Sequence, residues 1–421
     1  MFILEEYSID GVLKKCKTPG VDVFLYGAGS GVSSYSKIAY YALSAHGIQP
    51  KYFLDDNRDR VDDKLFGVSV QHPDILKNSK DKVIFISSNY FTSMWKTLLL
   101  NDTKDNVYSL VPLIESIPVD SLYFGGMEPE EVRRRIYTHK TKLHRILEIN
   151  NFKKKDILSL NVVDIQVTEK CTMKCRDCSN LMQYYESPKN SNKNTLENSV
   201  NVLLDAVDSI SDARVIGGEP FLYLELPSLL YKLCNSKKVG RVTIYTNGTF
   251  VPKENVLESL KNDKIEVEIT DYDSLSKNHV GMVKAFKEKG IRFISHKPQD
   301  WTDSSRIVLN KKTPGELSDM FDKCCVNDVL TLLHDRLYHC PFSANSHNLN
   351  AIKEGGRSDW VKLKLKGKDT YKDMRLKIQE FYFTRPYQTA CKYCLGRDYS
   401  QPQVIPAIQV RKSLPITILT N

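Results

Sequence analysis

Apolar runs and amphipathic segments alternate along the first part of the chain. Four apolar runs have the length of buried strands, at 21–29, 51–54, 67–70 and 83–88. An amphipathic segment at 33–46 separates the first two, and it closes at Gly47, the residue type most common just after a helix. Strand, helix and strand in this order predict a β-α-β unit. We therefore expect residues 1–117 to form one α/β domain with a parallel sheet.

The next segment, 118–160, is charged and helix-forming. Its apolar residues recur at helical spacing, at Ile136, Leu143, Ile146 and Leu147. This pattern predicts one or two helices that link the first domain to the second.

A second alternation of strands and helices begins at residue 161. The predicted strands are 162–168, 213–216, 242–246, 264–270 and 291–295, and the predicted helices are 198–209, 226–234, 254–262 and 280–289. Their regular order predicts parallel β/α units, enough for a partial (β/α)6 barrel at 161–305. Active sites of such barrels lie at the C-terminal ends of the strands, so motifs at those ends are expected to carry the function.

The composition excludes several classes of protein. Of the 421 residues, 41% are hydrophobic and 26% charged, which excludes a collagen-like or disordered chain. The longest apolar runs, such as 83–86, are far shorter than the roughly 18 residues of a membrane span. Glu5, Glu6 and Asp10 stand where a signal peptide would be basic. These features predict a soluble, cytoplasmic protein with no membrane partner.

The formal charge of +9 is a small excess for a chain of this length. Basic stretches at 133–145 and 362–368 lack the interleaved aromatic residues of a nucleic-acid surface. We expect a solvated surface and no nucleic-acid partner, with an anionic substrate as the alternative at either stretch.

Ten cysteines are the informative part of the composition, because cytosolic chains rarely form disulfides. Cys16 and Cys234 stand alone and are expected to be buried apolar residues. Cys171, Cys175 and Cys178 form a Cx3Cx2C loop just after the first strand of the second run. Three thiolates at this spacing can hold an iron–sulfur cluster and leave one iron open. A tetrahedral zinc site usually takes a fourth ligand close by, which this loop lacks.

Three more motifs stand at the ends of the following strands. They are Gly217-Gly218-Glu219-Pro220, Thr246-Asn247-Gly248 and Thr270-Asp271. Together with the Cx3Cx2C loop, they resemble the radical S-adenosylmethionine (SAM) enzymes over residues 160–300. One departure is Asp177, since the family usually has an aromatic residue just before the last cysteine.

The resemblance implies a [4Fe-4S] cluster on Cys171, Cys175 and Cys178, with SAM chelated at the open iron. It also implies that Glu219 accepts a hydrogen bond from the SAM ammonium and that the fourth strand end lies near the ribose. The residues implied in cofactor binding are Gly217, Gly218, Glu219, Pro220, Asn247, Thr270 and Asp271.

The remaining five cysteines lie toward the C-terminus, at Cys324, Cys325, Cys340, Cys391 and Cys394, with a hairpin-like stretch at 330–338 among them. Four thiolates suffice for a fully ligated cluster. The predicted set is Cys325, Cys340, Cys391 and Cys394, with Cys324 as an alternative ligand or a hydrogen donor. A zinc ribbon is the alternative.

Residues 306–421 resemble the auxiliary-cluster extensions of radical SAM enzymes, called SPASM in the longer form and Twitch in the shorter. No cysteine follows Cys394, which favours the Twitch form and a single additional [4Fe-4S] cluster.

The turn Gly27-Ala28-Gly29-Ser30-Gly31 resembles the phosphate-binding loop of a Rossmann domain, with Val32 in place of the third fingerprint glycine. Asp55 and Asp56 end the next strand, where such domains hold a ribose. The resemblance implies a Rossmann-like domain with a possible nucleotide site at Gly27, Gly29, Gly31, Asp55 and Asp56. A purely structural fold is the alternative. Similar small domains accompany sugar-modifying enzymes.

Taken together, the resemblance implies a radical SAM enzyme of the polysaccharide-associated kind. It would abstract hydrogen from a carbohydrate or nucleotide-sugar-like small molecule, leading to oxidation or epimerisation, with an electron donor such as flavodoxin or ferredoxin. One alternative is a radical SAM maturase of a ribosomally made peptide, and another is a zinc-stabilised binding protein without catalysis. No residue stands out as the catalytic acid or base.

Overall fold

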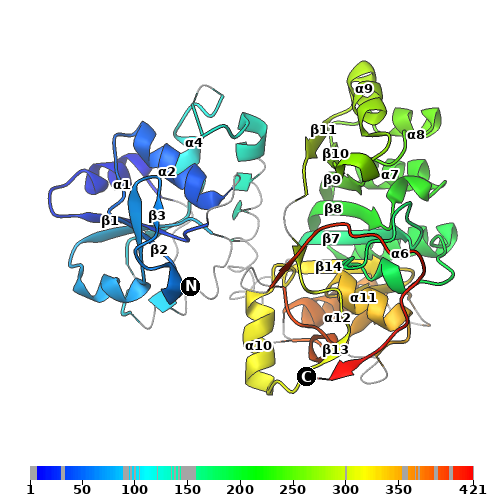
Figure 1. The fold of residues 1–421 in the computed structure, drawn as a ribbon. Helices are drawn as coiled ribbons and strands as arrows, with labels where there is room; N and C mark the ends of the chain where they lie inside the picture. The colour runs from blue at the N-terminus through cyan, green and yellow to red at the C-terminus, as the bar shows by residue number, and fades with distance from the viewer. Residues whose placement is uncertain are drawn as a thin grey trace. The chain divides into compact units, whose positions relative to one another are not determined.

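The computed structural model contains two compact units, Met1–Lys155 and Asp156–Asn421 (Figure 1). The structure describes residues 7–29, 34–88, 94, 97–98, 101–103, 105–120, 122–133, 135–136, 139–140, 143, 158–298, 301–352, 359–365, 367, 370–383, 387–397 and 402–420. None of the helices in these ranges is long and apolar enough to cross a membrane.

The first unit is built on one six-stranded sheet. Its strands are β1 Asp22–Tyr26, β2 Tyr52–Leu54, β3 Lys64–Leu65, β4 Val68–Gln71, β5 Lys82–Ile86 and β6 Val107–Tyr108, and its longer helices are α1 Ile9–Cys16, α2 Tyr35–Ala45 and α4 Val111–Glu115. The strand order is β3-β4-β2-β1-β5-β6, in which β1 pairs parallel with β2 and β5. The four strands predicted here and the helix predicted at 33–46 are confirmed.

The segment predicted as an inter-domain linker belongs partly to the first unit. Phe124, Met127, Val132 and Ile136 are buried in the same apolar core as α1 and α2. The segment therefore packs as part of the first unit, because one face of the sheet must be covered by apolar residues. Ile146 and Leu147 lie outside the described residues.

The second unit is built on an eight-stranded sheet with the order β11-β10-β9-β8-β7-β14-β15-β16. Its strands are β7 Ser159–Thr168, β8 Ser209–Gly217, β9 Val239–Thr246, β10 Ile265–Thr270, β11 Phe293–His296, β14 Val329–Leu333, β15 Arg336–Tyr338 and β16 Trp360–Lys362. The six strands from β11 to β14 run parallel. Helices α6 Lys193–Ala206, α7 Leu226–Asn235, α8 Glu254–Ser259 and α9 His279–Lys289 connect the strands from β7 to β11.

The C-terminal extension continues this sheet. Strand β14 pairs parallel with β7, and β15 and β16 follow as antiparallel strands, so the predicted hairpin at 330–338 is confirmed. The sixth parallel strand therefore comes from the extension and not from 161–305. Helices α10 Pro314–Lys323, α11 Pro341–Asn348 and α12 Tyr371–Phe383 belong to the extension, as does the pairing of β13 Val308–Leu309 with β18 Leu419–Thr420. A second small pairing joins β12 Trp301–Thr302, at the end of the predicted barrel, to β17 Gln403–Val404 of the extension.

The two faces of the parallel sheet differ in polarity. On β7, Val163, Ile165 and Val167 join the large apolar core under the helices, and Asp164 and Gln166 alternate with them. The same alternation gives β8, β9 and β10 buried or half-buried polar residues at Asp212, Arg214, Arg241, Thr243, Glu266 and Glu268. Because these strands carry polar residues, a search for apolar runs misses the first residues of β8. It assigns residues up to Ser209 to the preceding helix, whereas α6 ends at Ala206.

Candidate active site

The Cx3Cx2C loop leaves the C-terminal end of β7, as predicted, and its thiols receive hydrogen bonds. Asn247 Nδ2 lies 3.6 Å from Cys171 Sγ, and Gln409 Nε2 lies 3.2 Å from Cys175 Sγ. Burial, together with the negative charge of Cys178, raises the pKa of Cys175 to about 12. Burial likewise raises the pKa of Cys171 and Cys178. A metal cluster would have to displace the protons of these thiols, because its ligands are thiolates.

A segment far along the chain secures this loop. Arg176 N donates to Ile408 O at 2.7 Å, and Val410 N donates to Lys174 O at 2.8 Å. Gln409 Oε1 also accepts from Lys174 N at 2.7 Å. Residues 407–414, which we call the C-terminal strap (part of the red segment in Figure 1), thus pair with the cysteine loop. Nothing in the local sequence indicates this pairing.

The two glycines after β8 allow the GGEP turn to lie directly against the cysteine loop. Gly218 N donates to Thr168 O at 3.0 Å. A Cβ atom at Gly218 would lie 2.3 Å from Lys170 O and 2.7 Å from Cys171 Cβ, and one at Gly217 would lie 2.5 Å from Thr168 O. The sequence suggests that these glycines make room for SAM. The structure shows that they also make room for the chain that carries the thiols.

We expect Gly218→Ala to destabilise the second unit, because the nearest atoms are backbone and cannot rotate away. Overpacking of this kind costs about 1–3 kcal/mol. The matched control is Gly315→Ala in α10, where an added Cβ would meet nothing within 4 Å. Thermal melting should show a lower Tm for Gly218→Ala and an unchanged or higher Tm for Gly315→Ala. Equal Tm values would contradict the contact.

Glu219 is fully buried and ties two strand ends together. Its carboxylate accepts from Asn247 N at 2.9 Å, Thr246 Oγ1 at 3.0 Å and Phe221 N at 3.2 Å. Burial raises its pKa from 4.5 to about 7, although these hydrogen bonds act in the opposite direction. A contact with the SAM ammonium stays a prediction. The structure adds a positioning role, since Glu219 joins the GGEP turn to the Thr246-Asn247-Gly248 turn.

The raised pKa of Glu219 predicts a pH-dependent stability. The folded state holds this proton more tightly than the unfolded state, so the free energy of unfolding should fall as the pH rises from 4.5 to about 7. The full fall is roughly 3 kcal/mol. SAM-free protein melted anaerobically between pH 5 and 8 should show this loss, and Glu219→Gln should show less of it. Glu225→Gln, which changes an exposed carboxylate nearby, should behave like the wild type.

The other predicted cofactor residues lie at the same end of the sheet. Ser276 Oγ donates to Asn247 O at 2.7 Å and lies 3.4 Å from Thr270 O, which connects the third and fourth strand ends. Asp271 accepts from Lys297 Nζ at 2.8 Å, and this contact lowers the pKa of Asp271. Pro220 is buried at the start of a short 3-10 helix that follows Glu219.

Asp177 provides no aromatic ring at the last cysteine, but the aromatic Tyr272 is near enough to the thiols of Cys175 and Cys178 for their charges to act on it. Asp177 is buried and accepts from Arg176 Nε at 2.8 Å. Burial raises the pKa of Tyr272, and the nearby charges of Cys175 and Cys178 raise it further. The Tyr272 ring packs edge-to-face with Trp301 at 6.1 Å. Tyr272 directly follows Asp271 in the sequence, but no local pattern indicates that it lies near the cysteine loop.

Most of the C-terminal cysteines line one cavity in the extension. Cys324, Cys340, Cys391 and Cys394 line it, together with Phe321 and Arg397. Burial raises the pKa of Cys340 to about 11 and raises that of Cys391 and Cys394. Within the described residues, no group of His, Cys, Asp or Glu is placed to hold a single metal ion. Four thiols around one cavity suit an occupant larger than one ion.

Cys324 is the cysteine of the adjacent pair that lines this cavity. The described lining residues include Cys324 and do not include Cys325, which the sequence predicts as a ligand. Cys324 follows the last turn of α10, and Cys325 N donates to Arg397 O at 3.0 Å. The cavity lining favours Cys324 as the fourth thiol, and Cys325, whose charge acts on Cys394 and Arg397, stays the predicted alternative.

In the first unit, the predicted glycines and acids make contacts within the fold. Gly27 has φ +117°, and a Cβ there would lie 2.8 Å from Ser87 O. Asp55 Oδ2 accepts from Arg60 at 2.8 Å, and Asp56 Oδ1 accepts from Tyr26 at 2.7 Å. Gly29 is exposed at the start of the loop, and Gly31 lies outside the described residues.

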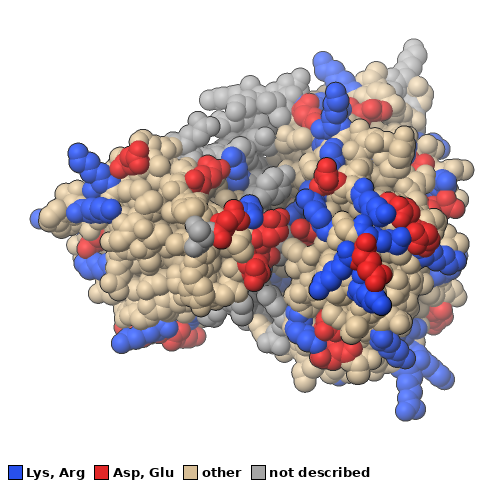
Figure 2. Space-filling model, turned by 90° about the horizontal axis from the view of Figure 1, so that it is seen from above, with Lys and Arg blue, Asp and Glu red and all other residues tan. Residues whose placement is uncertain are grey.

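Surface charges of both signs are mixed. On the face shown in Figure 2, Lys and Arg are interspersed with Asp and Glu. Within the basic stretch at 133–145, Arg133 pairs with Asp120 at 2.9 Å and Arg135 pairs with Glu131 at 2.7 Å. These cations are partly compensated, as expected for a solvated surface.

Comparison with known proteins agrees with this site. Residues 165–325 match the family described as the Radical SAM superfamily. A "GTP 3',8-cyclase" of Clostridium acetobutylicum is 26% identical over an alignment of 133 residues, with 28% of this chain and 41% of that protein covered. The chain therefore spans about two-fifths of this curated relative.

Two solved structures are similar at lower identity. Streptococcus suis SuiB bound to S-adenosylmethionine is 19% identical, with 58% of this chain and 52% of that chain covered and a TM-score of 0.29. BtrN in complex with AdoMet and 2-DOIA is 16% identical, with 56% and 93% covered and a TM-score of 0.35. Both scores are low, so the class of the protein rests on the family match. That match supports a radical SAM enzyme, a family that implies a [4Fe-4S] cluster and SAM binding.

Proposed function

We propose that this chain is a radical SAM enzyme that abstracts hydrogen from a carbohydrate or nucleotide-sugar-like substrate and oxidises it. Cys171, Cys175 and Cys178 would hold the cluster, and Cys324, Cys340, Cys391 and Cys394 would hold a second [4Fe-4S] cluster in a Twitch-like extension. When bound, the first cluster supplies the electron that splits SAM into methionine and a 5′-deoxyadenosyl radical.

The observation that carries the substrate class is the polar face of the sheet, which ends beside the thiol loop. Its charges are paired inside the fold, with Arg214 2.6 Å from Asp164 and Arg241 2.6 Å from Asp212. Near the C-terminal ends of the strands, Glu268 lies 3.7 Å from His296. Such a face favours a substrate rich in hydroxyl groups over an apolar one, because hydroxyl groups can exchange hydrogen bonds with these polar side chains, whereas apolar groups would only remove water from them.

The protein's own residues have three tasks in this proposal. The glycines and Glu219 fix the turns that face SAM, the polar face orients the substrate, and the strap shields the thiol loop from water.

The second cavity favours oxidation over epimerisation. A cluster held by these four thiols would supply the one-electron acceptor that such an oxidation needs. An alcohol-carbon radical becomes a ketone when it gives up one electron and its hydroxyl proton, the proton passing to water, and the abstracted hydrogen ends in 5′-deoxyadenosine.

We further infer that the first unit is Rossmann-like and accompanies nucleotide-sugar chemistry. This rests on its parallel strand order β4-β2-β1-β5-β6 with β1 in the middle. We also expect a cytoplasmic enzyme that takes electrons from flavodoxin or ferredoxin and binds neither nucleic acid nor membranes.

The test is an anaerobic assay of reduced protein with SAM and a panel of nucleotide sugars that carry deuterium on the ring carbons. We expect deuterium in 5′-deoxyadenosine and an oxidised product that has lost one ring deuterium and the hydroxyl proton. A product that keeps the alcohol oxidation state would mean epimerisation, and turnover of peptides alone would support a peptide maturase. Zinc in place of iron after anaerobic purification would contradict an enzyme of this class. Cys178→Ala serves as the control that cannot form the radical.

A further inference from the structure

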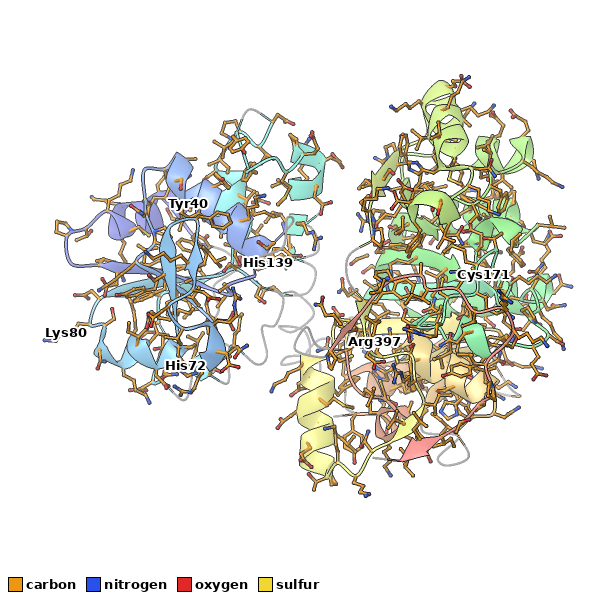
Figure 3. All side chains as sticks on the ribbon, viewed as in Figure 1. Tyr40, His72, Lys80, His139, Cys171 and Arg397 are labelled. Carbon is orange, nitrogen blue, oxygen red and sulfur yellow. The ribbon has the colours of Figure 1, made fainter. Side chains whose placement is uncertain are left out.

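Arg397 is a buried cation between the two groups of thiols. Its residue surface is 7% exposed, and it lines the cavity formed by Cys324, Cys340, Cys391 and Cys394. Its Nη2 atom donates to Ser179 O at 2.5 Å, one residue beyond Cys178. Figure 3 labels Arg397 and Cys171 in the second unit. A single side chain thus connects the thiol cavity of the extension to the end of the Cx3Cx2C loop.

This guanidinium has no carboxylate partner among the described residues, and its Nε has no hydrogen-bond partner there. Asp164, the carboxylate whose charge it influences, already pairs with Arg214 at 2.6 Å. A buried cation is unfavourable unless an anion compensates it. The cavity that Arg397 lines is the place where that anion is expected.

The thiols of both groups lie near Arg397. Cys340 and Cys394 line the same cavity as Arg397, and Cys178 directly precedes Ser179, whose carbonyl accepts from Arg397. The backbone of Arg397 is held as well, since its carbonyl accepts from Cys325 N at 3.0 Å. The residue is therefore held at both its backbone and its guanidinium, which keeps the cation at the cavity.

We propose that Arg397 compensates the negative charge of the second cluster and so favours its one-electron reduction by the substrate radical. The inference rests on the proposed function, because it requires a cluster on the four C-terminal thiols. Reduction adds one negative charge to the cavity, and a fixed cation stabilises the reduced form more than the oxidised form. The electron comes from the substrate-centred radical, whose hydroxyl proton leaves to water, so the Arg397 side chain keeps all its protons.

The experiment is an anaerobic redox titration of the holoenzyme, followed by EPR, for the wild type and three variants. Arg397→Gln should move the midpoint of the second cluster to more negative potential by at least the 59 mV that corresponds to a tenfold change in the equilibrium constant. Arg397→Lys keeps the charge and should stay close to the wild type. Lys392→Gln removes a half-exposed cation beside Cys391 and should shift the midpoint far less, because water screens that charge.

Several outcomes would overturn the proposal. If Arg397→Gln keeps its iron and its midpoint, the guanidinium does not compensate the cluster. If Arg397→Lys shifts as far as Arg397→Gln, charge is not the cause. If Arg397→Gln keeps the midpoint and only weakens substrate binding, Arg397 is a substrate anchor. If the wild type holds about four iron atoms per chain instead of about eight, the second cluster itself is absent and the proposed oxidation fails with it.

Discussion

Replacing Cys175 with alanine is expected to remove the cluster of the Cx3Cx2C loop and to reduce SAM cleavage to the background rate. The three cysteines of this loop are half-buried, and the charges of Cys175 and Cys178 act on their neighbours in the loop, so we expect all three to be ligands. Loss of one thiolate leaves two ligands, and two are too few to hold the cluster against solvent and chelators. The effect on SAM cleavage should exceed that of Gly218→Ala or Glu219→Gln, which leave all three thiols in place.

Iron and sulfide content, EPR of the reduced protein and 5′-deoxyadenosine formation measure this effect. Cys234→Ala is the matched control, because Cys234 is a half-buried cysteine of α7 that packs against the apolar core. It should keep all its iron and turn over normally. Full iron and normal SAM cleavage in Cys175→Ala would falsify the ligand assignment.

The second large effect separates two adjacent cysteines. Cys324→Ser should lose the cluster of the C-terminal cavity, because Cys324 is one of the four thiols that line it. SAM cleavage should continue in this variant, since the first site is untouched, but 5′-deoxyadenosine should form without ketone product. Cys325→Ser should keep both clusters, because its thiol is outside the described lining of the cavity.

The same pair of variants decides the fate of the substrate radical. Normal turnover of Cys325→Ser would exclude this thiol as a hydrogen donor and favour oxidation. A Cys325→Ser protein that keeps its clusters and loses turnover would instead indicate epimerisation, with Cys325 returning the hydrogen atom. Loss of a cluster in both variants would show that the set of four thiols is wrong.

Local patterns predict the elements that position the site. The strands from β7 to β11 are found from short apolar runs, and the Cx3Cx2C, GGEP and Thr246-Asn247-Gly248 motifs are found at their ends. This works because strand burial and turn chemistry depend on neighbouring residues. The helix predicted at 198–209 ends too late because β8 starts with polar residues such as Asp212, whose partner Arg241 lies on another strand.

Contacts between distant segments cannot be predicted in this way. The position of β14 beside β7, the choice between Cys324 and Cys325, and the place of Arg397 all depend on how the extension folds back on the sheet. Glu219 is a further case, because the GGEP motif indicates a carboxylate near SAM but not one that already accepts three hydrogen bonds. Such details arise from tertiary packing and leave no local pattern.

The strap has a consequence for how the protein is made in the cell. Gln409, which donates to Cys175, is 234 residues further along the chain. At a synthesis rate of about 5–20 residues per second, the ribosome needs about 12–47 s to make that stretch. During this time the loop of Cys175 has been translated but lacks the segment that secures it. The proposed cluster could therefore be loaded onto this loop in that interval, before the strap pairs with it.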